Sequence, residues 1–327
     1  MTVEPPTNCF PKSVGQPLEI ATLCIGLDIA WYGGSKGKPD TQNDCLISAV
    51  FNPQSAGMQL QFARVKLSHR DESAAQIFDA IQRVVEQHGT GVRVVLALDA
   101  PLQTNRTIPV GRIKARRSCE DVLSKGRMRI DEAAGGARGW HPNIQAGATL
   151  APRVQKLLAL LHQQLGFETW TEGSADASRL VIECFPAEAI WAAKRMGCYA
   201  RHLTSDQVKA YKKQQGKRLS SDDVAVLTNR VLLDGFSALS SVPLHWPNLV
   251  EALIGQMLAL EDWQKEGTYM GGKFLDDAVD SAICFATALS YANGNAHLWH
   301  DMANPGDGHI IGPGVTKGFL TGRTQLI

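Results

Sequence analysis

The sequence lacks the long apolar runs and the excess of charge that mark several classes of protein. No apolar run approaches the roughly 20 residues that a membrane-spanning helix requires, and residues 1–17 hold no apolar stretch suited to a signal peptide. Lys and Arg number 33 against 32 Asp and Glu, a formal net charge of +1, which provides no global basic surface for nucleic acid. We therefore expect a cytoplasmic protein with no membrane partner, in which any surface for nucleic acid is local.

Cysteine motifs are also missing. The seven cysteines are scattered and odd in number, and no two of them have the C-x-x-C spacing of a zinc knuckle. A disulfide framework is therefore not indicated, which agrees with a reducing compartment. What the chain does contain is 44% hydrophobic and 20% charged residues, the composition of an ordinary globular protein. Its 327 residues fit one elaborated α/β domain.

Short apolar runs between turn residues predict five strands. Residues 21–28, 92–101 and 179–186 are continuous apolar runs, which are typical of central strands buried on both faces. Residues 44–51 and 58–66 are joined by the hairpin-like segment NPQSAG, and the second of them alternates as a half-exposed edge strand does. The chain therefore begins with three strands that are neighbours in sequence.

Helical periodicity accounts for much of the rest. Residues 72–89 carry one apolar stripe and end at a glycine, so the order along the chain becomes β-β-β-α-β. Residues 1–20 contain four prolines and are interpreted as an irregular arm, and residues 103–150 as an irregular, Gly-rich and basic stretch. The other predicted helices lie at 151–166, 187–197, 205–216, 222–239, 249–265 and 275–292.

Acidic residues end three of the buried strands, at Asp28, Asp99 and Glu183. Strand ends of this kind meet at the edge of the sheet where α/β proteins bind their ligands. Asp277 and Asp280 are three residues apart and share one face of the predicted helix 275–292. Crowded carboxylates repel one another unless a cation lies among them, and oxygen ligands in this number favour Mg²⁺ or Mn²⁺. These five acids are the candidate catalytic residues, and the four aspartates are the candidate metal ligands.

Each acid also has a structural interpretation. Asp276 fits a helix cap, because Asp favours the first position of a helix and its positive end. Asp28 or Asp99 taken alone could simply end a strand in a turn. Glu183 could support the site or serve as a structural acid.

The chain resembles the predicted RNase H-like nucleases, the family known as domain of unknown function 429, over residues 21–311. The matching segments, in the family's order, are IGLDIAW (25–31), LALDAPL (96–102), RRSCEDVL (116–123), VIECFPAEAI (181–190) and DDAVDSAICFATAL (276–289). The resemblance implies a single ribonuclease H-like α/β domain over 21–327, with helical insertions at about 103–178 and 198–265. Its mixed five-stranded sheet would have the order 3-2-1-4-5, with strand 2 antiparallel, flanked by helices.

The resemblance also implies where the reaction takes place. It matches the first-strand acid to Asp28, the fourth-strand acid to Asp99, and the late-helix acids to Asp277 and Asp280. Such a site supports two-metal hydrolysis of a phosphodiester, in which ions roughly 4 Å apart activate water and stabilise the leaving oxygen. Asp28 would bridge the ions and Asp99 would bind one of them. Asp280, with or without Asp277, would bind the other. The implied function is a nuclease that requires Mg²⁺ or Mn²⁺.

Two further comparisons qualify this function. The segment D-A-V-D-S-A-I at 277–283 is similar to the D-x-x-D helix of Holliday-junction resolvases, another branch of the superfamily. Ribonucleases H proper add a glutamate from their first helix, whereas here Glu72 and Glu86 lie at the ends of the predicted helix 72–89. Cleavage of RNA–DNA hybrids is therefore not indicated by the sequence.

The candidate substrate contacts lie near the first two acids. Arg112, Arg116 and Arg117 belong to a stretch, 106–129, with eight basic residues, which could bind phosphates or could be a solvated loop. Trp31 follows Asp28 and could stack on a base, although a tryptophan that covers the core is the more frequent case. The expected partner is nucleic acid, either DNA or RNA.

Two other functions remain open. Sugar kinases and actin-like ATPases share this sheet topology and keep an acid on the first strand, but they expect Gly-Thr or Gly-Ser after it, where this chain has Ile29, Ala30 and Trp31. The segment GGSKGKP at 33–39 lacks the first glycine and the Ser or Thr of a phosphate-binding P-loop. The third possibility is a catalytically inactive binding module of the same fold.

Overall fold

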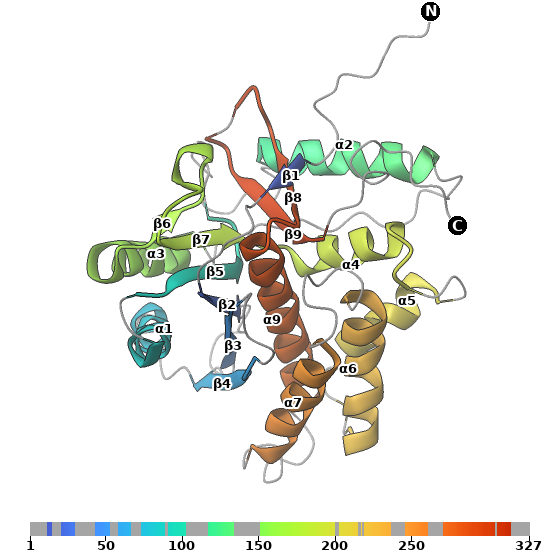
Figure 1. Cartoon of the computed structure of the whole chain (residues 1–327). Coiled ribbons are helices and arrows are strands. Elements are labelled where there is room, and N and C mark those ends of the chain that lie inside the picture. The colour runs from blue at the N-terminus through green and yellow to red at the C-terminus, as the bar shows by residue number, and fades with distance from the viewer. Residues whose placement is uncertain are drawn as a thin grey trace, which may run out of the picture.

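The structure is a computed structural model of the whole chain, and Figure 1 shows its arrangement. The residues that it describes are 12–14, 21–29, 43–52, 58–66, 73–88, 91–102, 117–133, 151–199, 203–214, 217, 219–236, 246–260, 271–304 and 306–314.

A six-stranded mixed sheet lies at the centre of the molecule (Figure 1). Its strands are β2 (Thr22–Asp28), β3 (Asn43–Phe51), β4 (Gln61–Lys66), β5 (Arg93–Asp99), β6 (Glu168–Thr169) and β7 (Arg179–Glu183). They lie in the order β4-β3-β2-β5-β7-β6. β3 is antiparallel to both of its neighbours, whereas β2, β5, β7 and β6 pair in parallel.

The five strands expected from the sequence all form. They lie in the expected order 3-2-1-4-5, and the second is antiparallel to the first. The sheet has one strand more than expected, because the two-residue β6 pairs with β7 at the far edge. Two residues are too few to show the period-2 alternation by which a strand is recognised in a sequence.

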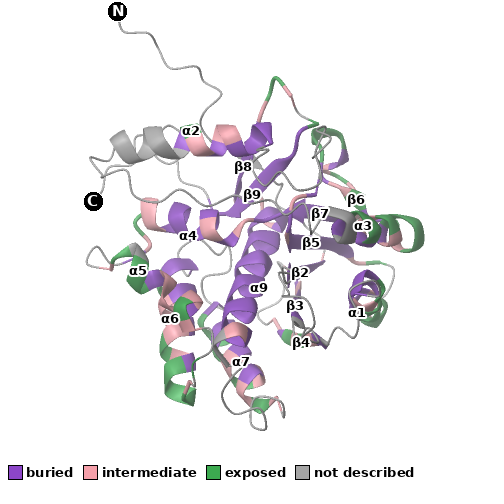
Figure 2. Cartoon of the chain, turned by 180° about the vertical axis from the view of Figure 1, so that it is seen from behind, coloured by how far each residue is buried: buried purple, intermediate pink, exposed green. Residues whose placement is uncertain are grey.

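Helices cover both faces of this sheet. α1 (Ser73–His88) and α3 (Ala151–Leu165) pack on one face, against alternate residues of β2 such as Leu23 and Ile25. α9 (Gly271–Ala292) lies on the other face and buries the intervening Cys24. α4 (Pro186–Arg195), α6 (Ser221–Phe236) and α7 (Trp246–Ala259) surround α9, which is buried along most of its length while α6 and α7 expose their outer sides (Figure 2). None of the described helices combines the length and the apolar character that crossing a bilayer requires.

A glycine lets α9 approach the sheet closely. A Cβ atom at Gly26, in the middle of β2, would overlap the backbone of Ser281 and Phe285 on α9. Helix and strand backbones can therefore meet only because this position has no side chain. The close approach sets the height of α9 above the end of β2.

A second, three-stranded sheet lies beside the first. β1 (Lys12–Val14) pairs antiparallel with β8 (Ala296–His300), which pairs antiparallel with β9 (His309–Pro313). The expectation of an irregular arm over 1–20 is therefore wrong at residues 12–14. A three-residue strand next to prolines exists only because β8 offers it a partner edge, which the local sequence does not show.

Two other expectations about helices need correction. The stretch 103–150, expected to be irregular, contains α2 (Ser118–Ala133), which packs through Cys119 and Leu123 against Trp299 and Ile310 of the second sheet. α2 is rich in polar residues, so its apolar periodicity is weak. The predicted helix 205–216 is instead α5 (Ser205–Val208) followed by the 3-10 helix η3 (Lys209–Gln214).

Candidate metal centre

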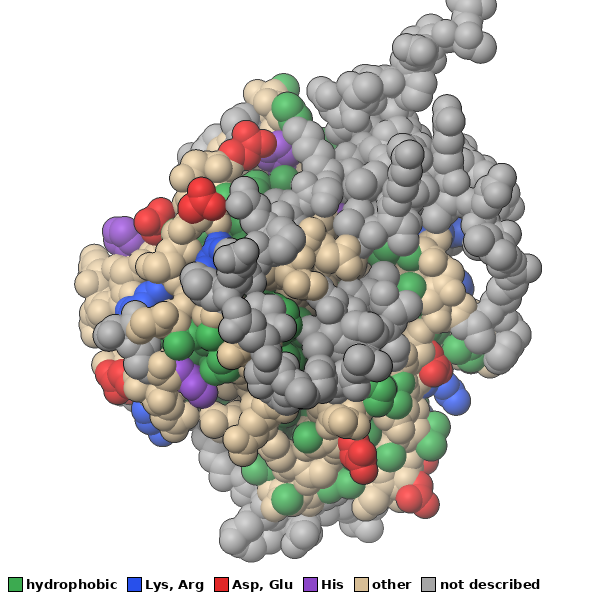
Figure 3. All heavy atoms as spheres, viewed as in Figure 1, with side chains coloured by type: hydrophobic (Ala, Val, Ile, Leu, Met, Phe, Trp, Pro, Cys, Tyr) green, Lys and Arg blue, Asp and Glu red, His purple; other side chains and the backbone are tan. Residues whose placement is uncertain are grey.

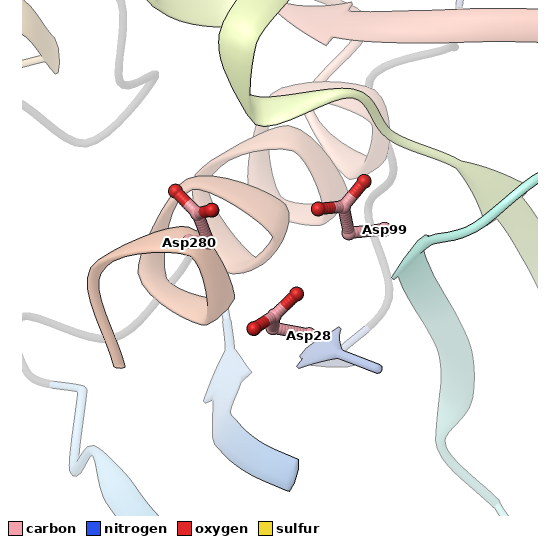
Figure 4. Close-up of side chains that lie close together, drawn as sticks. All are labelled: Asp28, Asp99 and Asp280. Atoms are coloured by element: carbon pink, nitrogen blue, oxygen red, sulfur yellow. The ribbon is translucent and has the colours of Figure 1, made fainter. Parts of the chain in front are cut away.

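Three aspartates come together where β2 and β5 end. The two strands are parallel neighbours, and Asp28 and Asp99 are partners in their register. α9 packs over both strands and brings Asp280 to the same place. One carboxylate oxygen from each aspartate lies within 4.8 Å of the other two, and Figure 4 shows the three side chains around one space. Asp28, Asp99 and Asp280 are called the acidic triad below.

A buried hydroxyl links the helix that carries Asp280 to the strand that carries Asp28. Ser281 follows Asp280, and its Oγ donates a hydrogen bond of 2.6 Å to the carbonyl oxygen of Cys45 on β3. The same oxygen accepts a hydrogen bond of 3.1 Å from the backbone N–H of Asp28. One serine thus joins α9, which carries Asp280, to both β2 and β3.

Burial and neighbouring carboxylates raise the pKa of each triad carboxyl. For Asp28, burial is the largest cause and the charge of Asp277 the next, and the pKa rises well above its ordinary value. Burial and then the charge of Asp280 raise the pKa of Asp99 to about 8, although Lys212 opposes them. Burial likewise raises the pKa of Asp280, again against Lys212. A cation that displaced the protons would stabilise the carboxylates, because it supplies the charge that burial and repulsion make necessary.

The residues of the triad fit a hard divalent cation. All three ligand atoms would be carboxylate oxygens, which Mg²⁺ and Mn²⁺ prefer, whereas zinc prefers nitrogen and sulfur. Asp28 and Asp280 are 5% exposed, but Asp99 is partly exposed, so the centre is not sealed from solvent. Asp28, Asp99 and Asp280 are the residues that could hold the ion.

Two lysines that the sequence reasoning missed border the triad. Lys212 Nζ, on η3, contacts Asp280 Oδ2 and lies 3.3 Å from Asp276 Oδ1. Lys273 Nζ, on α9, contacts Asp277 Oδ1 and lies 3.7 Å from Asp276 Oδ2. The acids therefore do not face one another alone, because two ammonium groups lie among them. Lys273 was visible in the sequence, one helical turn before Asp277, whereas Lys212 is 68 residues from Asp280 and gave no local signal.

Asp276 and Asp277 lie next to the triad on α9. The helix begins at Gly271, five residues before Asp276, so the expectation that Asp276 caps it is wrong. Asp276 instead faces the two lysines just described. Asp277 shares a hydrogen bond with Asp28, and burial raises its pKa to about 7 against the charge of Lys273. Its expected role as a ligand stays a prediction.

A second cluster of buried charge surrounds Arg117. The guanidinium Nη1 donates a hydrogen bond of 2.8 Å to Glu183 Oε2, Nη2 contacts Glu183 Oε1, and Nε donates at 2.9 Å to Glu120 Oε1. The backbone N–H of Leu102 also donates to Glu183 Oε2, at 2.9 Å. Arg117, Glu120 and Glu183 are called the Arg117 cluster below.

This cluster changes the interpretation of two candidate residues. Arg117 is 3% exposed and already binds two carboxylates, so its guanidinium is not available to a phosphate at the surface, contrary to expectation. Glu183 is bound by Arg117 and does not belong to the triad, so its catalytic role stays a prediction. Its charge still acts on the centre, because it contributes to the raised pKa of Asp99.

The remaining substrate candidates, Arg112, Arg116 and Trp31, lie outside the described residues. Among the described side chains on the face seen in Figure 3, basic and acidic groups are interspersed.

Comparison of the chain with protein-family models, curated proteins and solved structures finds no match. A function therefore has to follow from the chain's own geometry and chemistry.

Proposed function

We propose that the chain is a metal-dependent nuclease with a ribonuclease H-like fold, which hydrolyses phosphodiester bonds at the acidic triad. The observation that carries the proposal is the convergence of Asp28, Asp99 and Asp280 within 4.8 Å, from two parallel strands and a helix. The strand order 3-2-1-4-5 with an antiparallel second strand supports it, because the family resemblance implies the same sheet.

The chemistry follows from the ligand set. A bound Mg²⁺ or Mn²⁺ would supply Lewis-acid activation of water and charge stabilisation at phosphorus. Asp28, Asp99 and Asp280 would hold it, and the partly exposed Asp99 marks the side from which a substrate can approach. In the reaction, the oxygen of water bonds to phosphorus, the bond from phosphorus to the leaving oxygen breaks, and a proton from the water ends on that leaving oxygen.

Nucleic acid is the proposed substrate, and its phosphates carry negative charge. They would therefore need a positive charge at this acidic centre in order to bind. The five aspartates at and beside the triad outnumber the two lysines, so an anionic phosphate would be repelled without a divalent ion. This requirement predicts that substrate binding at the centre depends on metal. Phosphate contacts from Arg112 and Arg116 remain a prediction, whereas Arg117 is withdrawn from that role.

A cleavage assay with Mn²⁺ tests the proposal. Labelled single-stranded, duplex, hybrid and branched nucleic acids are incubated with wild type, Asp28→Asn and the surface variant Asp206→Asn. We expect cleavage of at least one substrate by wild type and Asp206→Asn, and a loss on the order of 10⁴-fold in Asp28→Asn, because the ligands of one ion act as a unit. Equal activity of wild type and Asp28→Asn would refute the assignment.

ATP hydrolysis is measured in the same preparations. Hydrolysis that is lost in Asp28→Asn, with no nuclease activity in wild type, would favour the kinase-like alternative. No activity of either kind, in protein shown to bind Mn²⁺, would favour the inactive binding module.

A further inference from the structure

We propose that Lys212 is a built-in second cation of the centre, so that the acidic triad binds one divalent ion per chain and not two. The inference rests on the proposed metal-dependent function. It departs from the two-ion arrangement that the family resemblance implies, and it follows from what the structure places around Asp280.

Both carboxylate oxygens of Asp280 already have partners from η3. Tyr211 Oη donates a hydrogen bond of 2.7 Å to Oδ1, and Lys212 Nζ contacts Oδ2. In a two-ion centre Asp280 would be the main ligand of the second ion. Because Lys212 lies against Oδ2, Asp280 would bind the single ion of the triad through Oδ1 and would have no second oxygen for another ion.

The other carboxylate expected to serve a second ion is engaged in the same way. Asp277 Oδ1 contacts Lys273 Nζ. Asp276 lies 3.3 Å from Lys212 and 3.7 Å from Lys273. Asp276, Asp277 and Asp280 therefore each form an ion pair with a lysine.

Lys212 is held in position. The neighbouring Tyr211 is fully buried and anchors η3 against α9. The ammonium of Lys212 lies 5.3 Å from the centroid of the Tyr211 ring, close enough for an attractive cation–π contact. The Lys212 side chain is 33% exposed, so it is partly accessible to solvent while its ammonium contacts Asp280.

The charges agree with one ion. Once a metal ion has displaced the protons, the five aspartates carry five negative charges and the two lysines two positive charges, which leaves three negative charges. One divalent ion would leave a single negative charge, whereas two would make the centre positive before any substrate is bound. Lys212 thus supplies, as part of the fold, the positive charge that a second ion would otherwise bring.

Counting bound Mn²⁺ tests this inference without an activity assay. Metal-free protein is titrated with Mn²⁺, and bound ions per chain are counted by calorimetry and by the loss of the free-ion electron paramagnetic resonance signal. The variants are Lys212→Met, which removes the charge, and Lys212→Arg, which keeps it. Lys213→Met is the matched control, because its ammonium, on the same 3-10 helix, pairs at 3.2 Å with the exposed Asp206.

We expect one Mn²⁺ per chain in wild type, Lys212→Arg and Lys213→Met, and two in Lys212→Met. Two ions in wild type would overturn the inference and leave the proposed function standing, and this count does not depend on whether any variant folds. One ion in both wild type and Lys212→Met would also overturn it. No bound ion in wild type would overturn the metal-dependent function itself.

Discussion

The acidic triad and the Arg117 cluster both lie where strands of the central sheet end. They differ in how many basic groups are bonded to their acids. In the Arg117 cluster one guanidinium binds two carboxylates, and the backbone of Leu102 contributes a further hydrogen bond. At the triad the acids outnumber the lysines, and the pKa of each triad carboxyl is raised. The Arg117 cluster has one excess negative charge and a cation bonded to both of its acids, which helps to hold the fold together, whereas the five aspartates at and beside the triad exceed their two lysines by three, which creates a demand for a cation.

Neutralising one triad residue tests the functional side of this comparison and has the largest expected effect. Asp99→Asn should lower metal-dependent cleavage on the order of 10⁴-fold, because the ion loses a ligand that it shares with Asp28 and Asp280. The stability of the metal-free protein should not fall, because a charge that is costly to bury has been removed. Steady-state rates and urea unfolding measure the two effects. A variant that loses stability and keeps its activity would mean that Asp99 is a structural residue and not a metal ligand.

Breaking the Arg117 cluster should give the opposite pattern. Arg117→Met leaves Glu120 and Glu183 buried without their cation, and loss of one partner of a buried ion pair costs about 3–5 kcal/mol of unfolding free energy. Arg83→Met, at an exposed site, is the control and should change stability by less than about 0.5 kcal/mol. Thermal and urea unfolding are the measurements. The double variant Arg117→Met with Glu183→Gln should recover part of the loss, and no recovery would count against an electrostatic cause.

Stability against pH tests the cost of burying the triad carboxylates. Burial and Asp280 raise the pKa of Asp99 to about 8 from an ordinary 3.8. A carboxyl with a raised pKa contributes stability that is complete below its unfolded pKa and is lost as the pH rises through its folded pKa. The unfolding free energy of the metal-free protein should therefore fall between those two values, and it should fall less in Asp99→Asn.

Adding Mn²⁺ in that experiment should restore stability at high pH. At a concentration 100 times its Kd, an ion that binds only the folded state adds about 2.7 kcal/mol. The gain should grow as the pH rises, because the ion and the protons compete for the same carboxylates. Melting curves at several pH values measure it. A gain that is independent of pH would place the ion somewhere other than the triad.

Asp276 should show the smallest effect. It lies beside the triad and faces Lys212 and Lys273, which are partly exposed and keep other carboxylate partners. Asp276→Asn should therefore cost at most about 1 kcal/mol of stability, as expected for a pair with solvent access. Cleavage should fall far less than in Asp99→Asn. Cleavage rates and melting temperatures of Asp276→Asn and Asp99→Asn, measured in parallel, test this expectation. An equal loss of activity in both variants would mean that Asp276 is itself a ligand.

The strands and their acids were accessible from the sequence because they depend on local patterns. Continuous apolar runs identified β2, β5 and β7, and each run stops at an acid, so the ends of neighbouring parallel strands had to bring Asp28 close to Asp99. The three-residue spacing of Asp277 and Asp280 identified one face of α9. That Asp28, Asp99 and Asp280 meet was expected and is observed, while their role as ligands stays a prediction.

What surrounds these acids was decided only by the tertiary structure. Lys212 is 68 residues from Asp280 and Arg117 is 66 residues from Glu183, and no periodic pattern relates residues that far apart. Which cation meets which acid depends on how α2, η3 and α9 pack on the sheet. The sequence by itself determined that carboxylates gather at one sheet edge, because strand ends and helix faces are local properties. Packing decided which of them are neutralised, because ion pairs form between side chains that only the folded chain brings within a few ångströms.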